Sequence, residues 1–311
     1  MTEPIKLPVI VGPTASGKTK LAAQCAYYLG AEIISADSRQ VYKGMDIGTG
    51  KDIDDYVVNN YAIPYHLIDI VDAGYTYNLY EFKRDFISVF NSLFEKGKKA
   101  IVCGGSGLYT EAIIKQYELH EVPQDIEFRK KCEQRSFEEL IEELKLYKTL
   151  HNKTDIDTKK RVIRALEIAK YEQTYGTQIQ FQKLPYEPIV IGINIDRESR
   201  RQRILNRLQL RMQQGMTHEV EHLLSQGVTP EKLMYYGLEY KYITLYVTGK
   251  ITEKQMFDEL YIAICQFAKR QMTWYRGMER RGIQIHWING NTSIENATQE
   301  AIEIINKSKT T

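Results

Sequence analysis

A glycine-rich segment near the amino terminus carries residue types that bind phosphate. It consists of Gly12, Pro13, Thr14, Ala15, Ser16, Gly17, Lys18 and Thr19, and it matches the pattern GxxxxGK(S/T). Its glycines allow the backbone to curl until several N–H groups point at one anion. Lys18 supplies a mobile charge for terminal phosphate oxygens, and the hydroxyl of Thr19 can hold Mg²⁺. The segment predicts a site for a di- or triphosphate with Mg²⁺, which a hydrolase, a kinase or a transferase could use.

The carboxylate of Asp37 is the second group that could do chemistry. It follows residues 32–35, an apolar run typical of a strand. We therefore expect Asp37 at the carboxyl edge of a sheet, where open α/β sheets bind their ligands. There it could cap a helix, orient a magnesium ligand or act as a general base. Residues 43–51, which come next, are glycine-rich and irregular, as is typical of a binding loop.

A second glycine-containing turn, residues 104–109, follows another apolar run. Its glycines allow close approach of the backbone, and Ser106 can donate or accept a hydrogen bond. Alone, this turn fits a plain connection between a strand and a helix equally well.

Hydrophobic patterning predicts the elements that must position these residues. Apolar runs predict strands at residues 7–11, 32–35, 66–70, 100–103, 189–195 and 283–288. Helical periodicity fits the residues after Gly17 as far as Leu29, and residues 79–94, 200–214, 218–224 and 252–275. Strands that alternate with helices predict the α/β class, here a P-loop NTPase-like parallel sheet with helices on both faces.

Between two of these strands the pattern is entirely helical. Residues 125–175 show helical periodicity and no candidate strand. The simplest arrangement is an all-helical insertion domain at residues 116–187. It would separate a first part of the P-loop core, residues 1–115, from a second part, residues 188–311, which holds the last strands and the carboxy-terminal helices.

Composition excludes several classes of protein. Of 311 residues, 43% are hydrophobic and 26% are charged, which is typical of a globular protein rather than a disordered or membrane chain. The net charge of +2 means that any nucleic-acid surface must come from local clusters. The four cysteines form no CxxC pair, which argues against a zinc ribbon and favours a reducing, cytoplasmic compartment. Tyrosine is frequent, with 22 residues, and its amphipathic ring suits hydrated contact surfaces.

Taken together, these segments carry a resemblance to a known family. The sequence resembles the bacterial tRNA dimethylallyltransferases, also called tRNA isopentenyltransferases, in order from Pro8 to Gly277. The segments that carry the resemblance are residues 12–19, 35–51, 104–109, 161–167 and 268–277. Residues 37–51 and 269–277 are far more specific to that family than the phosphate loop is.

The resemblance implies a reaction and three catalytic residues. Members of the family transfer a dimethylallyl group from dimethylallyl diphosphate to N6 of the adenosine 3′ of the anticodon, tRNA position 37, and they release diphosphate. Asp37 occupies the position of the family's base, which an exocyclic amine needs because its lone pair is delocalised. Lys18 and Mg²⁺ on Thr19 would neutralise the departing diphosphate. Arg207 matches an arginine that reaches the same diphosphate, although the spacing alone also fits a solvated helix face.

The resemblance also implies the residues that contact the tRNA anticodon stem-loop. They are Asp37, Ser38, Arg39, Gln40, Ser106, Arg129, Lys160, Arg161, Val162, Ile163 and Arg164. One segment departs from the family, because Asp155 to Thr158 stands where His-Pro-Asn-Asp is usual.

Two other functions share the same phosphate loop. A nucleoside or small-metabolite kinase could use the arginines of residues 200–211 as a lid, and an RNA-binding protein could bind without chemistry. Residues 37–51 argue against a kinase, and a free carboxylate at Asp37 argues against simple binding. The partners we expect are therefore tRNA and dimethylallyl diphosphate, with no membrane and with the chain acting as a monomer.

Overall fold

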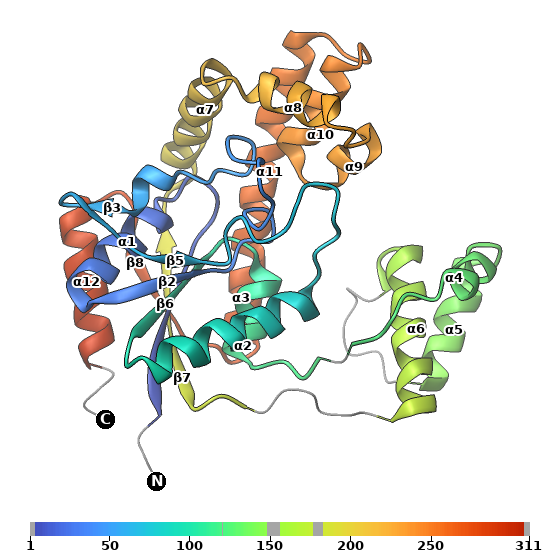
Figure 1. Ribbon diagram of the computed structural model, residues 1–311, viewed down its shortest axis with the longest axis horizontal. Coiled ribbons are helices and arrows are strands. Elements are labelled where there is room, and N and C mark those ends of the chain that lie inside the picture. Colours follow the sequence, from blue (N-terminus) through green and yellow to red (C-terminus); the bar gives the residue numbers. More distant parts are fainter. Residues whose placement is uncertain (1–3, 120, 148–155, 177–182, 308–311) are drawn as a thin grey trace. The chain divides into compact units, whose positions relative to one another are not determined.

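The computed structural model describes residues 4–119, 121–147, 156–176 and 183–307 (Figure 1). Asp155, where the predicted departure from the family begins, lies outside these residues. The chain divides into two compact units, Met1–Gln116 with Leu184–Thr311, and Tyr117–Lys183. The sequence predicted an insertion at residues 116–187, and these bounds lie within a few residues of it. None of the described helices is long and apolar enough to cross a bilayer.

The larger unit is built on a six-stranded parallel sheet. Its strands lie in the order β5 (Tyr65–His66), β2 (Ala31–Ser35), β6 (Lys99–Gly104), β1 (Ile5–Val11), β7 (Tyr186–Asn194) and β8 (Ile285–Asn289). Five of the six predicted strands lie within about three residues of their predicted bounds. The third was predicted at residues 66–70, and that prediction is wrong beyond His66. Leu67 and Asp69 have φ angles of 62° and 56°, so the backbone there is left-handed and cannot continue a strand.

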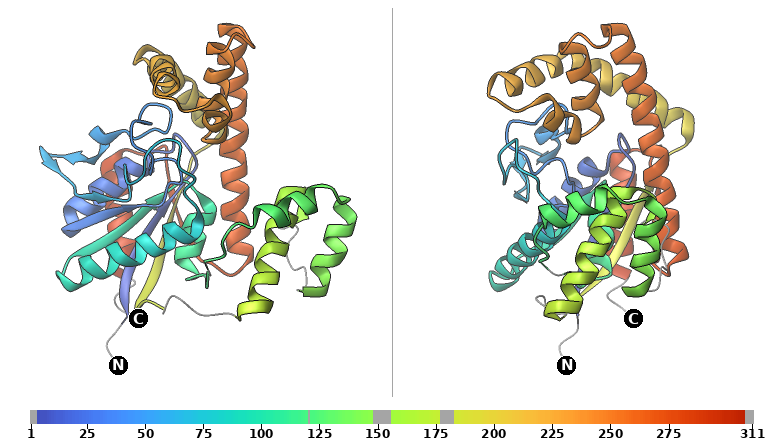
Figure 2. Two further views of the ribbon diagram at one scale, coloured as in Figure 1. Left: turned by 45° about the vertical axis from the view of Figure 1, so that its right-hand side comes forward. Right: turned by 90° about the vertical axis from the view of Figure 1, so that its right-hand side faces the viewer.

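Two apolar layers cover the sheet because successive side chains of a strand point to opposite faces. Ile10 belongs to the layer formed with α1 (Lys18–Leu29) and α12 (Ile294–Lys307). Val9 and Val11 belong to the opposite layer, with α2 (Leu79–Glu95), α3 (Gly107–Ile114) and α11 (Glu253–Arg280). The left view of Figure 2 shows α12 and α11 on different sides of the sheet. The α/β class with helices on both faces is thus confirmed.

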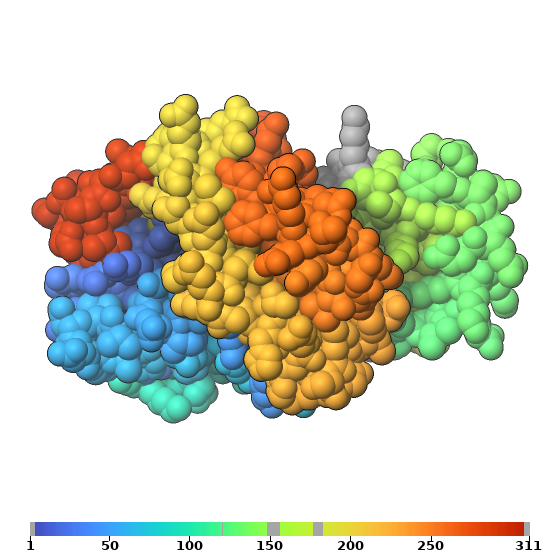
Figure 3. All heavy atoms as spheres, turned by 90° about the horizontal axis from the view of Figure 1, so that it is seen from above, coloured from blue at the N-terminus to red at the C-terminus, as the bar shows by residue number. Residues whose placement is uncertain are grey.

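Four helices lie over the carboxyl edge of the sheet (Figure 1), and Figure 3 shows the molecule from that side. They are α7 (Arg197–Gln213), α8 (Met216–Ser225), α9 (Pro230–Tyr235) and α10 (Leu238–Val247). A short helix η1 (Ile53–Tyr56) and a small antiparallel pair, β3 (Val57–Val58) and β4 (Tyr61–Ala62), complete the unit. The sequence prediction did not include α9, α10, α12 or this pair.

The smaller unit is a helical bundle. It consists of α4 (Ile126–Glu133), α5 (Phe137–Tyr147) and α6 (Lys159–Tyr175), with no strand among its described residues. Leu140 and Leu144 of α5 pack against Val162 and Leu166 of α6 in a core of its own. The predicted helical character of this region is confirmed.

Candidate active site

Three loops that carry the predicted chemistry meet because their strands are neighbours. The strands β2, β6 and β1 are adjacent in the sheet, so the segments after them emerge side by side. Hydrogen bonds join two of them directly. The backbone N–H of Ser38 donates to Ser106 Oγ at 3.0 Å, and that hydroxyl lies 3.1 Å from Ser38 Oγ. Ser106 therefore also holds the loop that follows β2. A plain connection between a strand and a helix would not need these contacts.

The phosphate loop has the backbone that its pattern predicts. Gly17 lies at the amino-terminal cap of α1 with φ of 85°, and no side chain caps the helix. Gly12 has no room for a side chain, because a Cβ there would lie 2.6 Å from Ser16 Oγ. That hydroxyl is buried and has no hydrogen-bond partner among the described residues. A buried hydroxyl without a partner, beside N–H groups at the start of a helix, is typical of a loop that binds an anion.

Lys18 lies where the phosphate loop meets the turn after β6. Its Cε and Nζ would each lie 3.3 Å from a Cβ at Gly105, so a side chain at that position would press on the lysine. Burial lowers the pKa of Lys18, and the negative charge of Asp37 acts in the opposite direction. The two predicted catalytic groups are therefore close enough to interact.

Asp37 is held by its own loop. Its Oδ1 accepts a hydrogen bond from the backbone N–H of Arg39 at 3.0 Å. No described helix begins at this residue, which excludes the helix-cap alternative. The general base and the magnesium-orienting role remain.

The helix α11 ties the phosphate loop to the turn after β6. Gln271 accepts a hydrogen bond from the N–H of Thr14 at 2.8 Å and donates one to the carbonyl of Gly105 at 2.9 Å. One turn later, the hydroxyl of Tyr275 reaches the carbonyls of Gly105 and Gly12 at 3.2 and 3.4 Å. The resemblance pointed to this segment without these roles. Their spacing of four places both residues on one helix face.

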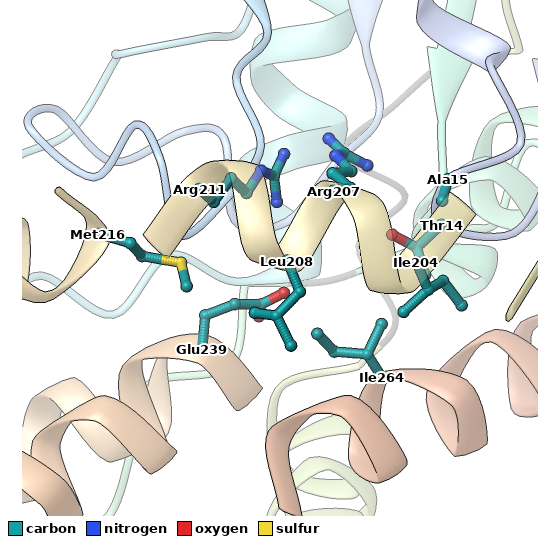
Figure 4. Close-up of a pocket in the computed structure, with 9 residues that line it drawn as sticks. All are labelled: Thr14, Ala15, Ile204, Arg207, Leu208, Arg211, Met216, Glu239 and Ile264. Atoms are coloured by element: carbon teal, nitrogen blue, oxygen red, sulfur yellow. The ribbon is translucent and has the colours of Figure 1, made fainter. Parts of the chain in front are cut away.

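Arg207 faces the phosphate loop rather than open solvent. It lines a pocket with Thr14 and Ala15 of that loop. Figure 4 shows Arg207 and Arg211 extending from the same side of α7. Both guanidinium groups contact Asp52, at 2.5 and 3.2 Å. Burial lowers the pKa of Arg207, and the charge of Arg211 lowers it further.

Residues 43–51 form a loop that reaches from Asp37 to these arginines. Near its end, Gly50 has a φ of 73°, which favours glycine, and a Cβ there would lie 2.3 Å from Arg211 and 2.5 Å from Arg207. The buried Nζ of Lys51 forms an ion pair with Asp46 at 2.8 Å. Gln40 was predicted to contact tRNA, but its side chain is 8% exposed. Its amide instead donates to the carbonyl of Gly50 at 3.0 Å and thereby fixes the loop.

Glu219 of α8 binds the same loop. Its carboxylate accepts hydrogen bonds from the N–H groups of Asp46, Ile47 and Gly48 at 2.8, 2.7 and 3.0 Å. It also accepts one from the hydroxyl of Tyr240 at 2.6 Å. No residue pattern points to Glu219, because its three amide partners lie more than 170 positions away in the sequence.

We expect Glu219→Ala to free this loop. Three amides and a phenol lose a charged acceptor, and a charged hydrogen bond contributes about 1.5–3 kcal/mol. The free energy of unfolding in urea should fall by about 3 kcal/mol. The KM for a diphosphate donor should rise about tenfold, because the loop places Asp52 beside Arg207. The exposed Glu221, on the same helix, provides the control Glu221→Ala. An unchanged urea midpoint for Glu219→Ala would exclude the role.

The predicted RNA-binding residues of the bundle differ in how exposed they are. Lys160 and Arg161 are exposed. Val162 and Ile163 are 0% and 3% exposed, and their side chains form the bundle core. Their contact with RNA stays a prediction. The apolar residues of an amphipathic helix form one face, and that face turns toward the core.

Arg129 and Arg164 form a buried-acid cluster with Glu167. Arg129 Nη2 lies 2.6 Å from the Glu167 carboxylate, and Arg164 contacts the same oxygen. Burial alone would raise the pKa of Glu167, but hydrogen bonds from Arg129 and Arg164 outweigh it and hold that pKa below its usual range. In this structure both arginines therefore serve the bundle itself.

This cluster predicts acid sensitivity. A carboxylate whose pKa is lower in the folded state adds stability above its unfolded pKa, near 4.3, and loses it as pH falls through the folded value. Thermal unfolding of the whole protein, followed from pH 7 to pH 3, should show a loss of stability at low pH. Glu167→Gln should lack this loss, because it has no carboxylate to protonate. If that variant and the original protein lose stability in parallel below pH 4.3, the cluster is not responsible.

The described residues contain no group of three or more His, Cys, Asp or Glu that could hold a metal. The phosphate loop offers the hydroxyl of Thr19 as a ligand for a metal ion. Mg²⁺ retains several waters and takes phosphate oxygens readily, so a single protein hydroxyl fits a magnesium ion that arrives with a diphosphate.

Comparisons with known proteins agree with one another. The sequence model of the family described as IPP transferase matches residues 40–278. A tRNA dimethylallyltransferase of Bacteroides fragilis is 53% identical over 287 residues, 92% of this chain and 93% of that protein. One of Parabacteroides distasonis is 52% identical, over 97% and 98% of the two chains. The crystal structure of a tRNA isopentenylpyrophosphate transferase from Bacillus halodurans is similar, with a TM-score of 0.70, 29% identity and 98% of each chain covered.

Proposed function

This chain belongs to the IPP transferase family, and from that premise we propose that it transfers the dimethylallyl group of dimethylallyl diphosphate to N6 of the adenosine 3′ of the anticodon in tRNA. The products are N6-isopentenyladenosine and diphosphate. One observation carries the proposal beyond family membership. A carboxylate, Asp37, follows β2 at the same edge of the sheet as the phosphate loop that follows β1, with only β6 between the two strands.

The carboxylate fits the half of the reaction that occurs on the base. The lone pair of N6 forms the new bond to C1 of the prenyl group, and one N6 proton must leave as that bond forms. Asp37 takes this proton. Its Oδ1 is fixed by the N–H of Arg39, so the carboxylate is oriented before the substrate arrives.

The phosphate loop fits the other half. The bond between C1 and the bridging oxygen breaks, and its electron pair leaves with the diphosphate. The N–H groups at the start of α1, the ammonium of Lys18 and the guanidinium of Arg207 would stabilise that charge. Mg²⁺ held by Thr19, when bound, would neutralise part of the diphosphate charge.

The apolar side of the pocket fits the prenyl chain. Ile204, Leu208, Met216 and Ile264 line it beside Thr14 and Ala15 of the phosphate loop. Figure 4 shows Leu208 and Ile204 on the side of α7 that faces Ile264, away from the arginines. A five-carbon chain would thus lie on hydrocarbon while its diphosphate end meets charge.

A kinase is the less favourable interpretation. A lid must move, yet Arg207 and Arg211 are joined to Asp52 and pack on Gly50 of the loop that follows Asp37. We propose further that the chain acts as a monomer in the cytoplasm. Its four cysteines are free, which suits a reducing compartment.

The test mixes the purified protein with unmodified tRNA, Mg²⁺ and labelled dimethylallyl diphosphate. Label should appear in the RNA, on the adenosine 3′ of the anticodon after nuclease digestion. Phosphate transfer from ATP to a nucleoside, with no label in RNA, would replace the proposal with the kinase.

A further inference from the structure

An exposed aromatic ring lies close to the segment that carries Asp37. Tyr235, the last residue of α9, is 51% exposed, whereas the next residue, Tyr236, is completely buried. The guanidinium carbon of Arg39 lies 5.4 Å from the centroid of the Tyr235 ring. The backbone N–H of Arg39 donates to Asp37. The ring–cation pair is therefore connected through a single residue to the general base of the proposed reaction.

The position of the exposed ring is fixed by its neighbours. The hydroxyl of Tyr236 accepts a hydrogen bond from the N–H of Gly74 and donates one to the carbonyl of Tyr75, both at 2.7 Å. The Tyr235 and Tyr236 rings meet edge to face, with centroids 5.8 Å apart. The ammonium of Lys232, hydrogen-bonded to Thr76 at 2.5 Å, lies 5.9 Å from the Tyr235 ring. An exposed ring held this firmly can bind a flat ligand at little cost in conformational entropy.

The chemistry of the pair selects its ligand. An aromatic face and a guanidinium plane are the surfaces on which proteins stack unpaired nucleobases. The proposed reaction requires the target adenine to leave the stack of the anticodon loop, which deprives its neighbours of a stacking partner. A replacement partner beside the active carboxylate would stabilise that state.

We propose that Tyr235 and Arg39 form a stacking site for the unpaired nucleobase adjacent to the target adenine. This inference rests on the proposed function and adds a subsite to it. The specificity that it provides concerns shape and stacking, not the hydrogen-bonding edges of the base.

The experiment uses an anticodon stem-loop RNA and measures kcat/KM for prenyl transfer at saturating donor. Tyr235→Ala is compared with Tyr235→Phe and Tyr235→Trp, which keep an aromatic face. Tyr28→Ala is the matched control, because Tyr28 is an exposed tyrosine of α1, 62% exposed. Each variant is assayed on three RNAs: intact, abasic on the 5′ side of the target, and abasic on its 3′ side. Salt titrations accompany the intact RNA.

Tyr235→Ala should lower kcat/KM on intact RNA about ten- to a hundredfold, as loss of one base–aromatic stack does. The aromatic replacements and Tyr28→Ala should stay within about twofold of the original protein. The salt dependence should keep its slope, because stacking releases no counterions. On one of the two abasic RNAs the original protein should fall to the level of Tyr235→Ala, and the variant should fall no further.

Three results would overturn the stacking site. Tyr235→Ala could match the original protein, Tyr235→Phe could fall as far as Tyr235→Ala, or the losses from the variant and from each abasic RNA could multiply. Failure of the proposed function is distinct, because the unaltered protein would then leave intact tRNA unlabelled.

Discussion

Asp37→Ala is expected to lower the turnover number for prenyl transfer by about two to four orders of magnitude, the usual effect of losing a general base. Donor binding should remain, because no backbone N–H of the phosphate loop and no charge on Lys18 is removed. Single-turnover assays at saturating donor and tRNA measure the loss. Equilibrium dialysis with labelled dimethylallyl diphosphate measures what is retained.

Two further variants separate basicity from structure. Asp37→Asn keeps an oxygen that can accept the hydrogen bond from Arg39, yet it cannot take a proton at neutral pH. It should therefore be as slow as Asp37→Ala. The exposed Asp54 provides the control Asp54→Asn, which should leave turnover unchanged. A turnover of Asp37→Asn within about tenfold of the original would assign the proton to another group.

Lys18→Met is expected to damage binding and chemistry together. Methionine keeps most of the side-chain volume over Gly105 while removing the charge. The turnover number should fall about 10²–10³-fold, as it does when one preorganised group that stabilises transition-state charge is lost. The dissociation constant for the donor should rise as well, because the same charge acts on the bound diphosphate. Lys20→Met, at an exposed lysine two residues later, is the matched control.

The lowered pKa of Lys18 adds a pH dependence. Burial places that pKa below 10.5 in the free protein. An anion binds better to the protonated form, so donor affinity should weaken as pH rises through the Lys18 pKa. Calorimetric titration across pH 7–10.5 should show this decline in the original protein and a flatter profile in Lys18→Met. Parallel profiles would place the titrating group elsewhere.

The sheet could be predicted because buried strands leave a direct trace in the sequence. Residues 189–195, for example, are apolar except for Asn194, since helices cover both faces of the sheet. The run at residues 66–70 includes the buried Leu67 and Ile68, but the left-handed backbone of Leu67 and Asp69 ends the strand at His66. Hydrophobicity reports burial, and it does not report φ.

The site could be predicted as far as it depends on strand order. Parallel strands deliver their following loops to one edge, which brought residues 12–19, Asp37 and Ser106 together. Glu219 and Gln271 escaped prediction because they bind backbone groups of distant loops, which leave no residue pattern. Val162 and Gln40 were predicted to contact RNA because they match positions of the family. Both side chains are buried, and a match of positions does not report packing.

The contacts made by Gln271 and Tyr275 have an evolutionary consequence. Both side chains reach peptide groups of the phosphate loop and of the turn after β6, not side chains. Side chains in those loops can therefore change without breaking these hydrogen bonds, as long as the backbone conformation is kept. A change at Gln271 instead loosens two loops at once. We therefore expect position 271 to vary less among relatives than position 14, where only the backbone N–H is bound.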